Sequence, residues 1–430
     1  MRSKRSVGLF ILLVALALVA AACGSSDDTT TTTAAPTETT EATETTEATE
    51  TTEATETTEA IEPLTFGMLL VGPENDRGWS QAHFEGGQYM ADKLGAEMIT
   101  LDKINTSDRP ETSAETVIDE MVAAGATLIF ATSNDFSDAV QAAAENHPDV
   151  SMIFSSGDTA WEDGKAYRAD LPNLGNIMGE MTLGKMIAGC AAGLTTQTGH
   201  IAYLGPLIND ETRRLVNSAY LGARHCYELA GNDPADLEFE VNWIGFWFNI
   251  PGFTLDPTEV TNAFIDGGAD VVMSGIDTTE AIVRVGQRAE AGEAVWAVPY
   301  DFEGSCDEAP EVCVGVPYFN WGPSYLETAQ AVQDGTFSAT WQWIPPDWDD
   351  MNNRDTSIIG WLPGDGLSAD ASAVVDTFIA GLADGSINLY VGPLNNQDGS
   401  PWLADGEEAT DLQVWYAETL LEGVDGPAAA

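Results

Sequence analysis

The sequence predicts an α/β protein of two Rossmann-like lobes with parallel sheets, joined by a hinge. From residue 64 onwards, apolar runs of strand length alternate with patterns of helical period, which is typical of parallel sheets covered by helices on both faces. Nine such strands would make a large single sheet, and a break containing Gly and Pro near residues 160–175 divides the series. We therefore expect two consecutive lobes with a ligand cleft between them.

The expected elements follow one another regularly. Strands are placed at 65–71, 97–101, 127–132, 151–155, 200–204, 237–243, 270–274, 294–299 and 312–318. Helices are placed at 80–94, 111–124, 136–146, 175–194, 210–230, 258–267, 278–291 and 323–334. This order predicts a first lobe at 64–172 plus roughly 321–362, a second lobe at 173–320, and a C-terminal segment at 363–430 that completes or covers the lobes.

The N-terminal residues resemble the start of an exported lipoprotein. A basic start precedes an apolar run from 7 to 22, which is short for a membrane span and suits a signal peptide at 1–22. Small residues then precede Cys23, as in a lipobox, so we expect cleavage before Cys23 and a lipid on its sulfur. The alternative is secretion without an anchor. No later run is long and apolar enough to span a bilayer, so the lipid would be the only anchor, on the extracytoplasmic face of the cell membrane.

Residues 23–63 are low in complexity and repeat the hexamer TTEATE from Thr39. A segment without aromatic residues cannot bury enough apolar surface to offset its ordering, so we expect a disordered linker. The linker would hold the folded part away from the lipid surface.

The charge of the chain excludes one class of partner. It has 69 acidic and 16 basic residues, a formal net charge of −53. Such a charge excludes nucleic acid as a partner and disfavours an anionic ligand. A general acidic surface is the simplest explanation of the bias.

The cysteines of the folded part fit an exported protein. Cys306 and Cys313 lie seven apart in one loop, and Cys190 and Cys226 lie late in two expected helices. We favour the disulfides Cys190–Cys226 and Cys306–Cys313, although four cysteines allow three pairings. No CxxC pair occurs and the four histidines are scattered, so neither a metal nor another cofactor is expected.

A strand–loop–helix unit opens the folded part and carries the first candidate site. The apolar run 64–71 is followed by the loop GPENDRGW and a helical pattern. Ligands of open α/β sheets bind at the carboxyl ends of the strands, where Asn75 and Asp76 offer hydrogen bonds and Trp79 offers a flat surface. His83 lies one turn past Trp79 on the same side of the helix; a solvated helix residue is the alternative. These residue types favour a small polar ligand with an aromatic ring.

Further candidates follow the later strands. Polar side chains at strand ends are Asn134, Asp135, Asp158, Asp277, Asp301 and Asn320. Aromatic candidates are Trp243, Phe246 and Trp247 at and after the end of the strand at 237–243, and Trp321 after the strand at 312–318. Asp135 and Asp277 have a structural alternative as helix caps, and the aromatic residues have one as core.

Three motifs resemble the basic membrane protein (BMP) family of ABC-transporter substrate-binding lipoproteins. In NDRGWSQAHFEGG, Asp76 matches an acidic position of the family, Trp79 its first aromatic residue and Gln81 its Gln. In VWAVPYDFEG, Asp301 occupies the position of the Asp that follows a late strand. The lipobox with its linker is the third match.

The resemblance implies the fold of type I periplasmic binding proteins and a purine nucleoside or purine base as the ligand. It implies that Trp79 stacks on the base and that Asp301 bonds the ribose. Ser80 replaces the family's Asn, and the Lys of many nucleoside binders near the last crossover is replaced by Asn320 and Trp321. The Trp-rich pattern is more similar to the branch that binds free bases such as adenine.

No catalytic signature occurs in the sequence. GxSxG, HExxH, a P-loop and GxGxxG after a strand are all missing, so we do not expect an enzyme. We expect a monomeric, lipid-anchored solute-binding protein that delivers an adenine-like base or a purine nucleoside to an ABC permease. The alternatives are a receptor for a sugar or another small molecule, an extracellular enzyme that acts on nucleosides, and a sensory subunit.

Overall fold

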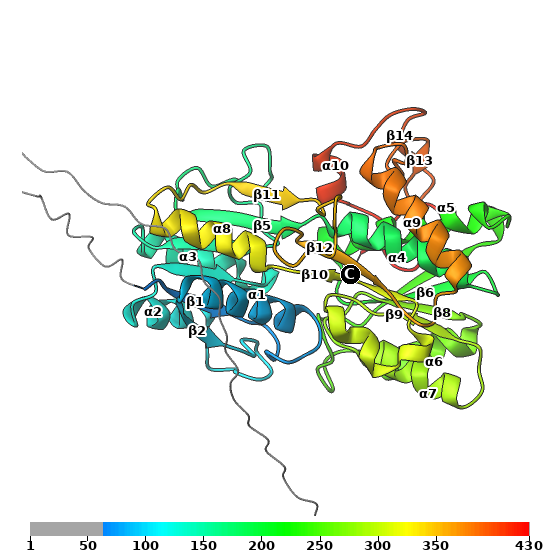
Figure 1. Cartoon of the computed structure of the whole chain (residues 1–430), viewed down its shortest axis with the longest axis horizontal. Coiled ribbons are helices and arrows are strands. Elements are labelled where there is room, and N and C mark those ends of the chain that lie inside the picture. The colour runs from blue at the N-terminus through cyan, green and yellow to red at the C-terminus, as the bar shows by residue number, and fades with distance from the viewer. Residues whose placement is uncertain (1–62, 430) are drawn as a thin grey trace, which may run out of the picture. The chain divides into compact units, whose positions relative to one another are not determined.

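Two parallel sheets organise the part of the chain that the computed structural model describes, residues 63–429 (Figure 1). The first sheet has the strand order β11-β5-β4-β3-β1-β2, and the second has the order β15-β7-β6-β8-β9. The prediction of an α/β fold with two parallel-sheet lobes is confirmed. The expected signal peptide, the lipidated Cys23 and nearly all of the expected linker lie outside the described residues.

The first lobe surrounds the six-stranded sheet. Its strands are β1 (Thr65–Leu69), β2 (Glu97–Leu101), β3 (Leu128–Ala131), β4 (Ser151–Ser155), β5 (Leu174–Gly179) and β11 (Trp341–Ile344). Its helices are α1 (Trp79–Leu94), α2 (Ala114–Ala123), α3 (Ser137–Asn146) and α8 (Gly322–Gln333). α1 packs against α8, and α2 packs against α3, so helices cover both faces.

The second lobe surrounds the five-stranded sheet. Its strands are β6 (His200–Gly205), β7 (Glu238–Trp243), β8 (Val271–Ser274), β9 (Trp296–Val298) and β15 (Val424–Asp425). Its helices are α4 (Met181–Thr195), α5 (Asp210–Leu229), α6 (Pro257–Gly267), α7 (Glu280–Glu290) and α9 (Ala369–Ala383). α4 packs along α5 and against α9, while α6 packs against α7.

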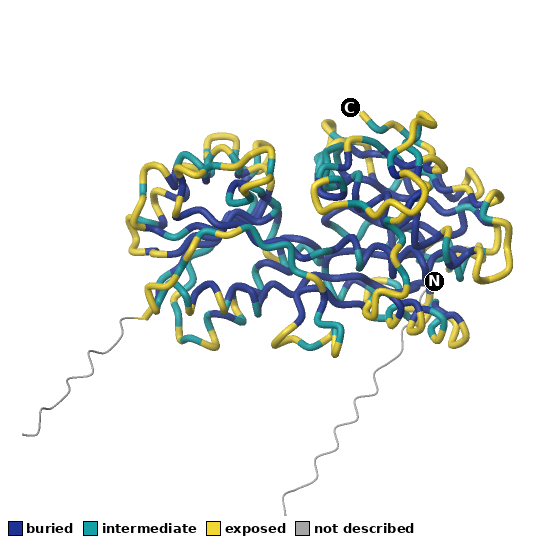
Figure 2. The backbone as a smooth tube through the Cα atoms, turned by 90° about the horizontal axis from the view of Figure 1, so that it is seen from above, coloured by how far each residue is buried: buried dark blue, intermediate teal, exposed yellow. Residues whose placement is uncertain are grey.

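Both sheets are buried, as the apolar strand sequences require. All four residues of β3 and all four of β8 are buried, which is typical of parallel strands with helices on both faces. Figure 2 shows buried segments running through the two lobes and exposed residues gathered in the peripheral loops. Local signals set the helix ends: Asn209 and Thr212 form a capping box on α5, and Asp256 with Pro257 starts α6.

The chain crosses between the lobes three times. The first crossover joins β5 to α4, the second joins β10 (Gly315–Phe319) to α8, and the third joins β11 to β12 (Ile359–Pro363). β10 and β12 pair with each other in antiparallel fashion and lie between the two lobes (Figure 1). These segments form the hinge between the two sheets.

The structure corrects three expectations around the hinge. Residues 174–179 form β5 of the first sheet, so the expected helix at 175–194 starts only at Met181 and the first lobe extends past 172. The run LGNIMG is mostly apolar and directly precedes the helix. The sequence pattern therefore did not show where the strand ends and the helix begins. β12, expected in the first lobe, pairs with β10 outside both sheets.

The C-terminal segment 363–430 is added mainly to the second lobe. It contributes α9 and the edge strand β15 there, along with the small elements β13 (Leu394–Asn395), β14 (Pro401–Leu403) and α10 (Asp411–Trp415). Among residues 63–429, no helix has the length and apolar character needed to cross a bilayer. Within the same range, no three His, Cys, Asp or Glu side chains form a metal-binding cluster.

Two disulfides lie in the second lobe. Cys190–Cys226 joins α4 to α5, and Cys306–Cys313 closes a short loop before β10. These are the two pairs that the spacing of the cysteines favoured. The first ties together the helix pair that leads out of the first crossover.

Candidate ligand-binding site

A cavity lies between the lobes and is lined from both, and we call it the interlobe cavity. The first lobe contributes Trp79, Ser133, Asn134 and Ser156, and the second contributes Glu211, Thr212, Leu215, Trp247, Gly275, Asp277 and Tyr300. Each of these residues follows the carboxyl end of a strand. The cavity is therefore built at the sheet edge where α/β proteins bind ligands.

The strand order explains why these segments meet. In the first sheet the chain leaves β1 towards β2 on one side, whereas β3 lies on the other side of β1. The second sheet repeats this arrangement with β7 and β8 on either side of β6. The loops after such neighbouring strands diverge and leave a crevice at the switch point. The two crevices face each other, and the interlobe cavity lies between them.

Trp79 is held rigidly at the wall of the cavity. It begins α1, its indole Nε1 donates a hydrogen bond of 2.6 Å to the carbonyl oxygen of Thr132, and only 7 % of the residue is exposed. Trp321 packs edge-to-face against the ring at 5.4 Å between centroids. A pre-positioned aromatic ring of this kind is suited to stacking on a flat ligand.

Trp247 lines the cavity from the opposite lobe. It lies in the loop after β7, and its indole Nε1 donates to the Asp135 carboxylate of the first lobe at 2.6 Å. The backbone amide of Asp277 donates to the Trp247 carbonyl at 2.9 Å. The side chain thus links the lobes across the cavity and presents a second aromatic surface.

The cavity is narrow in this conformation. Space wide enough for a water molecule amounts to about 20 Å³, which is room for about one or two waters. Leu215, Trp247 and Tyr300 of the second lobe pack into the core cluster of the first lobe. Entry of a ring-sized ligand therefore requires the lobes or these side chains to move apart, as hinge closure around a ligand would provide.

The second-lobe wall of the cavity is acidic. Glu211 and Asp277 line it, and no Lys or Arg is among the described residues that do so. Burial raises the pKa of both carboxyls, and for Asp277 the neighbouring Asp301 adds to the shift. The carboxyls accept hydrogen bonds from N–H or O–H donors, and in the protonated form that burial favours each can also donate one. The wall offers no positive charge to an anionic ligand.

Asp301 lies behind this wall and does not line the cavity. It is fully buried, and neither carboxylate oxygen has a hydrogen-bond partner among residues 63–429. Burial raises its pKa, and Lys185 acts in the opposite direction. The direct contact with ribose that the resemblance implies for Asp301 is not formed in this conformation.

Lys185 is a buried cation that the sequence analysis missed. It lies in α4, its Nζ donates to the Ser274 carbonyl at 2.7 Å, and it stands 3.4 Å from the ring centroid of Tyr300. Burial lowers the pKa of Lys185 to about 7, against the opposing charge of Asp301. Tyr300 lines the interlobe cavity, and Lys185 packs against the Tyr300 ring from inside the second lobe.

The loop before α1 is organised by Asp76. Its carboxylate accepts from the backbone amides of Gly78, Ser80 and Gln81 at 2.9–3.1 Å, which satisfies free amides of the first helical turn. Burial nevertheless raises the pKa of Asp76 to about 6. Asp76 thus caps the helix that carries Trp79 and does not line the cavity.

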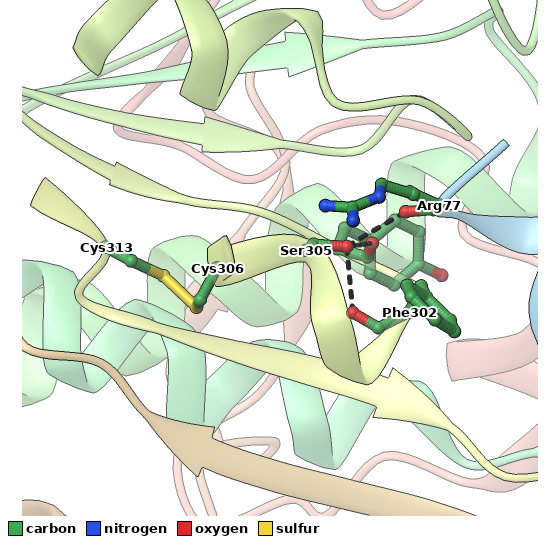
Figure 3. Close-up of a disulfide and its surroundings, with 6 residues drawn as sticks. Arg77, Phe302, Ser305, Cys306 and Cys313 are labelled. Atoms are coloured by element: carbon green, nitrogen blue, oxygen red, sulfur yellow. Dashed lines mark hydrogen bonds between the residues drawn. A yellow bond between two sulfur atoms is a disulfide. The ribbon is translucent and has the colours of Figure 1, made fainter. Parts of the chain in front are cut away.

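The same loop contacts the second lobe through the disulfide-closed turn. Ser305 Oγ donates to the carbonyl oxygen of Arg77 at 2.9 Å and to that of Phe302 at 2.8 Å, next to Cys306 (Figure 3). The Arg77 guanidinium also forms an ion pair with Glu308 at 2.7 Å. Three non-glycine residues near the cavity, Arg77, Ser156 and Asp301, have positive φ angles of 57–70°, and such strained positions gather at binding sites.

The structure brings only part of the predicted set to the interlobe cavity. Trp79, Asn134, Trp247 and Asp277 line it, and Asp135 supports it through Trp247. The remaining residues that the sequence singled out are Asn75, Asp76, His83, Asp158, Trp243, Phe246, Asp301, Asn320 and Trp321. Asn75 is exposed, Phe246 packs against Phe248, and Asp158 lines an adjoining cavity.

Four of the other predicted residues are structural. His83 and Trp321 stack on each other at 4.1 Å in the core of the first lobe, fully buried. Trp243 lies in the second-lobe core and donates to the Pro427 carbonyl at 2.8 Å. The Asn320 amide donates to backbone carbonyls of the third crossover, including that of Ser357 at 2.6 Å. None of these four side chains lines the interlobe cavity.

Several cavity residues escaped the sequence analysis. They are Ser133, Ser156, Glu211, Thr212, Leu215, Gly275 and Tyr300. Ser133 directly precedes the predicted Asn134, and Tyr300 directly precedes the predicted Asp301. The position of both residues at the end of a strand could therefore have indicated them. Glu211 lies beyond the loop that follows the strand predicted at 200–204. The sequence analysis names no ligand-binding residue after that strand.

Comparison with known proteins identifies the family. Residues 64–343 match the family described as ABC transporter substrate-binding protein PnrA-like (Bmp). The chain belongs to this family. Its membership confirms the resemblance seen in the motifs around Trp79 and Asp301, and it makes the protein a substrate-binding protein of the ABC-transporter type.

Individual relatives agree with this family and fold. A purine-binding protein of Brucella abortus is 27 % identical over 366 residues, which cover 85 % of this chain and 93 % of the relative. A Haloferax volcanii protein, named as a candidate ABC transporter glucose-binding protein, is 26 % identical over 66 % of this chain and 64 % of its own length. A solute-binding protein structure from Aeropyrum pernix covers 84 % of this chain and 100 % of that chain with a TM-score of 0.60 at 12 % identity; it shows the same fold.

Proposed function

We propose that this Bmp-family protein is the lipid-anchored receptor of an ABC importer and binds a purine base or a purine nucleoside in the interlobe cavity. The observation that carries the proposal is that Trp79 and Trp247 line one cavity from opposite lobes. Two aromatic surfaces of this kind can enclose a flat heteroaromatic ring, and stacking contributes about 1–3 kcal/mol per base.

The polar wall supports the same ligand class. Glu211 and Asp277 accept hydrogen bonds, while Ser133, Asn134 and Thr212 can donate as well as accept. The edge of a neutral purine presents both donors and acceptors, whereas a phosphorylated ligand would meet two carboxylates. The purine-binding relative from Brucella abortus supports this assignment.

Binding to the purified protein tests the ligand. The protein is unfolded under non-reducing conditions and refolded to remove carried-over ligand, and adenine, adenosine and glucose are then titrated by calorimetry. We expect saturable binding near one-to-one for a purine. Binding of glucose alone would favour the sugar receptor suggested by the Haloferax volcanii relative, and release of ribose from adenosine would favour an enzyme.

The anchor and the permease are tested in cells. We expect labelled fatty acid to be incorporated at Cys23, and Cys23→Ala to release the protein from the membrane fraction. Unchanged membrane association of the Cys23→Ala variant would exclude the lipid anchor. Uptake of labelled purine should require both the receptor and a permease encoded beside it.

A further inference from the structure

A short stretch of the C-terminal segment, residues 410–421, connects the two lobes, and we call it the clasp. It contains α10 and the turn that follows it. On the second-lobe side, α5 holds the main chain of the clasp. Arg213 Nε donates to the Ala417 carbonyl at 2.6 Å, and the Asn217 side-chain amide donates to the Thr419 carbonyl at 3.0 Å. Because these bonds hold the backbone, the clasp belongs to the second lobe.

Tyr416 of the clasp reaches across to the first lobe. Its hydroxyl donates to the Asp158 carboxylate and accepts from the backbone amide of Lys165, both in the loop after β4. The Lys165 ammonium lies 4.3 Å from the centre of the Tyr416 ring and forms an ion pair with Glu418 of the clasp at 3.3 Å. One loop of the first lobe thus supplies Tyr416 with an acceptor, a donor and a cation.

The aromatic residues beside Tyr416 extend this contact. Trp415 of the clasp packs edge-to-face on Trp341 and Trp343 of β11, at 5.1 and 5.3 Å between ring centroids. Trp161 of the first lobe stacks on Trp341 at 3.9 Å, and the Tyr416 ring lies parallel to Trp161 at 6.0 Å. Separation of the lobes would expose these apolar faces to water, so the contact favours the conformation in which the lobes meet.

The clasp is a non-covalent link between the lobes, unlike the three crossovers, and its attachments adjoin opposite walls of the interlobe cavity. Ser156, in the same loop as Asp158, lines the first-lobe wall. Glu211 and Thr212, in the helix that holds the clasp, line the second-lobe wall. Movement of the two walls apart must therefore break one attachment. The ion pair on the first-lobe side is largely exposed, whereas the bonds on the second-lobe side hold the main chain, so the first-lobe attachment is the one that opens.

We propose that the clasp is a latch: Tyr416 engages the first lobe when the lobes close, and its release limits how fast a bound ligand leaves. A ligand enclosed between the lobes leaves only after they separate, so a contact made only in the closed form slows its release. None of residues 410–421 lines the interlobe cavity. The clasp therefore sets how long a ligand is held and leaves the choice of ligand to the cavity, and the inference does not depend on a purine as the ligand.

Two variants loosen the clasp from opposite sides. Tyr416→Phe keeps the ring but removes the hydroxyl that bonds Asp158, and Lys165→Met removes the first-lobe cation. Lys165 lines neither the interlobe cavity nor the adjoining one, so an effect of Lys165→Met does not come from a lost ligand contact. Tyr390→Phe is the matched control, because the Tyr390 hydroxyl shares a hydrogen bond of 2.6 Å with Ser218 inside the second lobe.

The rate of ligand release is the measurement that tests the latch. Each full-length protein is freed of bound ligand, saturated with labelled adenine or adenosine, and mixed with an excess of the unlabelled ligand. We expect Tyr416→Phe to speed the loss of label about tenfold for either ligand, Lys165→Met to speed it about two- to threefold, and Tyr390→Phe to leave it unchanged. Because the two side chains form one contact, the double variant should speed release by less than the product of the two factors.

Release of a bound purine from Tyr416→Phe at the unaltered rate overturns the latch, and so does an equal effect of Tyr390→Phe. Faster release that is confined to one of two bound purines indicates a lost ligand contact and also overturns it. If neither purine binds to the unaltered protein, the proposed function is wrong, and small-angle scattering of the ligand-free proteins decides the latch. Tyr416→Phe should then have a larger radius of gyration than Tyr390→Phe, and an equal radius overturns the latch.

Discussion

Gly78 of the first lobe lies directly against Asp277 of the second. A β-carbon built on Gly78 would stand 1.6 Å from the Asp277 carbonyl oxygen, so only glycine permits this approach of the lobes. Asp277 lines the interlobe cavity, and Gly78 immediately precedes Trp79. The contact therefore sets how closely the two walls of the cavity meet.

We expect Gly78→Ala to hold the lobes apart. Because the added methyl group would meet backbone, the conformation with this contact should become less populated. A ligand that is admitted by movement of Leu215, Trp247 and Tyr300, with the contact kept, should then lose at least about tenfold in apparent affinity. Small-angle scattering should show a larger radius of gyration with saturating adenine. Gly267→Ala is the control, since a β-carbon there meets nothing within 4 Å. Equal affinity in the Gly78→Ala variant would show that closure does not depend on this contact.

Replacement of Trp79 by leucine should weaken purine binding. Leucine keeps apolar bulk but removes the aromatic face, so we expect adenine affinity to fall about tenfold or more. Trp243→Leu is a matched control, because both residues are 7 % exposed and both indoles donate to a backbone carbonyl. Both variants should lose thermal stability, but only Trp79→Leu should lose affinity in calorimetry. A similar loss of affinity in both would assign Trp79 to structure alone.

The strands were predictable because parallel strands are continuous apolar runs. β1, β3 and β8 each stand out from polar surroundings, and the residues that follow them include Trp79, Asn134 and Asp277 of the cavity. Strand order could not be read from the sequence, but the rule that ligands bind at carboxyl ends does not need it. That rule predicts the sheet edge at which the interlobe cavity lies.

The direction of a side chain could not be predicted at the end of a strand, in a loop or inside a helix. Trp243 is the last residue of β7 and enters the second-lobe core, whereas Trp247, four residues later in the loop, reaches the cavity, because that loop has no period that fixes the direction of a side chain. Lys185 lies in a helix whose other residues are nearly all apolar. Its position near the cavity is seen only in the structure, where it packs against Tyr300. Trp321 precedes α8 as Trp79 begins α1, but it stacks on His83 in the core.

Lys185 should stabilise the fold through its buried hydrogen bond and its charge near Asp301. Lys185→Met keeps the volume of the side chain but removes the hydrogen bond to the Ser274 carbonyl and the cation near Asp301, so we expect the free energy of unfolding to fall by about 1–3 kcal/mol. Denaturant unfolding measures this loss. Lys93→Met, at an exposed position, should leave the free energy of unfolding nearly unchanged.

A double variant separates charge from packing at this site. Lys185→Met with Asp301→Asn should recover much of the lost stability, because the uncompensated carboxylate is gone and Asn tolerates the positive φ of 70° at this position. Strictly additive losses in the two single variants would show that the two side chains do not interact.

Glu180 should make the protein more stable at mildly acidic pH. It lies at the first crossover, and burial, with the nearby charge of Asp411, raises its pKa from 4.5 to about 7. A carboxyl with a raised pKa in the folded state contributes stability that is present below pH 4.5 and is lost as the pH rises through about 7. Asp76, with its pKa raised to about 6, acts in the same direction, whereas the buried His83, whose pKa is lowered, acts against it.

The variant Glu180→Gln isolates this contribution from the others. Gln cannot ionise, so the variant should lose the part of the pH dependence that Glu180 supplies. We expect its melting temperature to exceed that of the unaltered protein by at least about 2 °C at pH 8, and by less at pH 5. The exposed Glu290→Gln of α7 serves as the control and should give the same small difference at both pH values. An equal effect of Glu180→Gln at pH 5 and pH 8 would contradict a raised pKa at the crossover, since only a carboxyl that ionises between these values can make the two measurements differ.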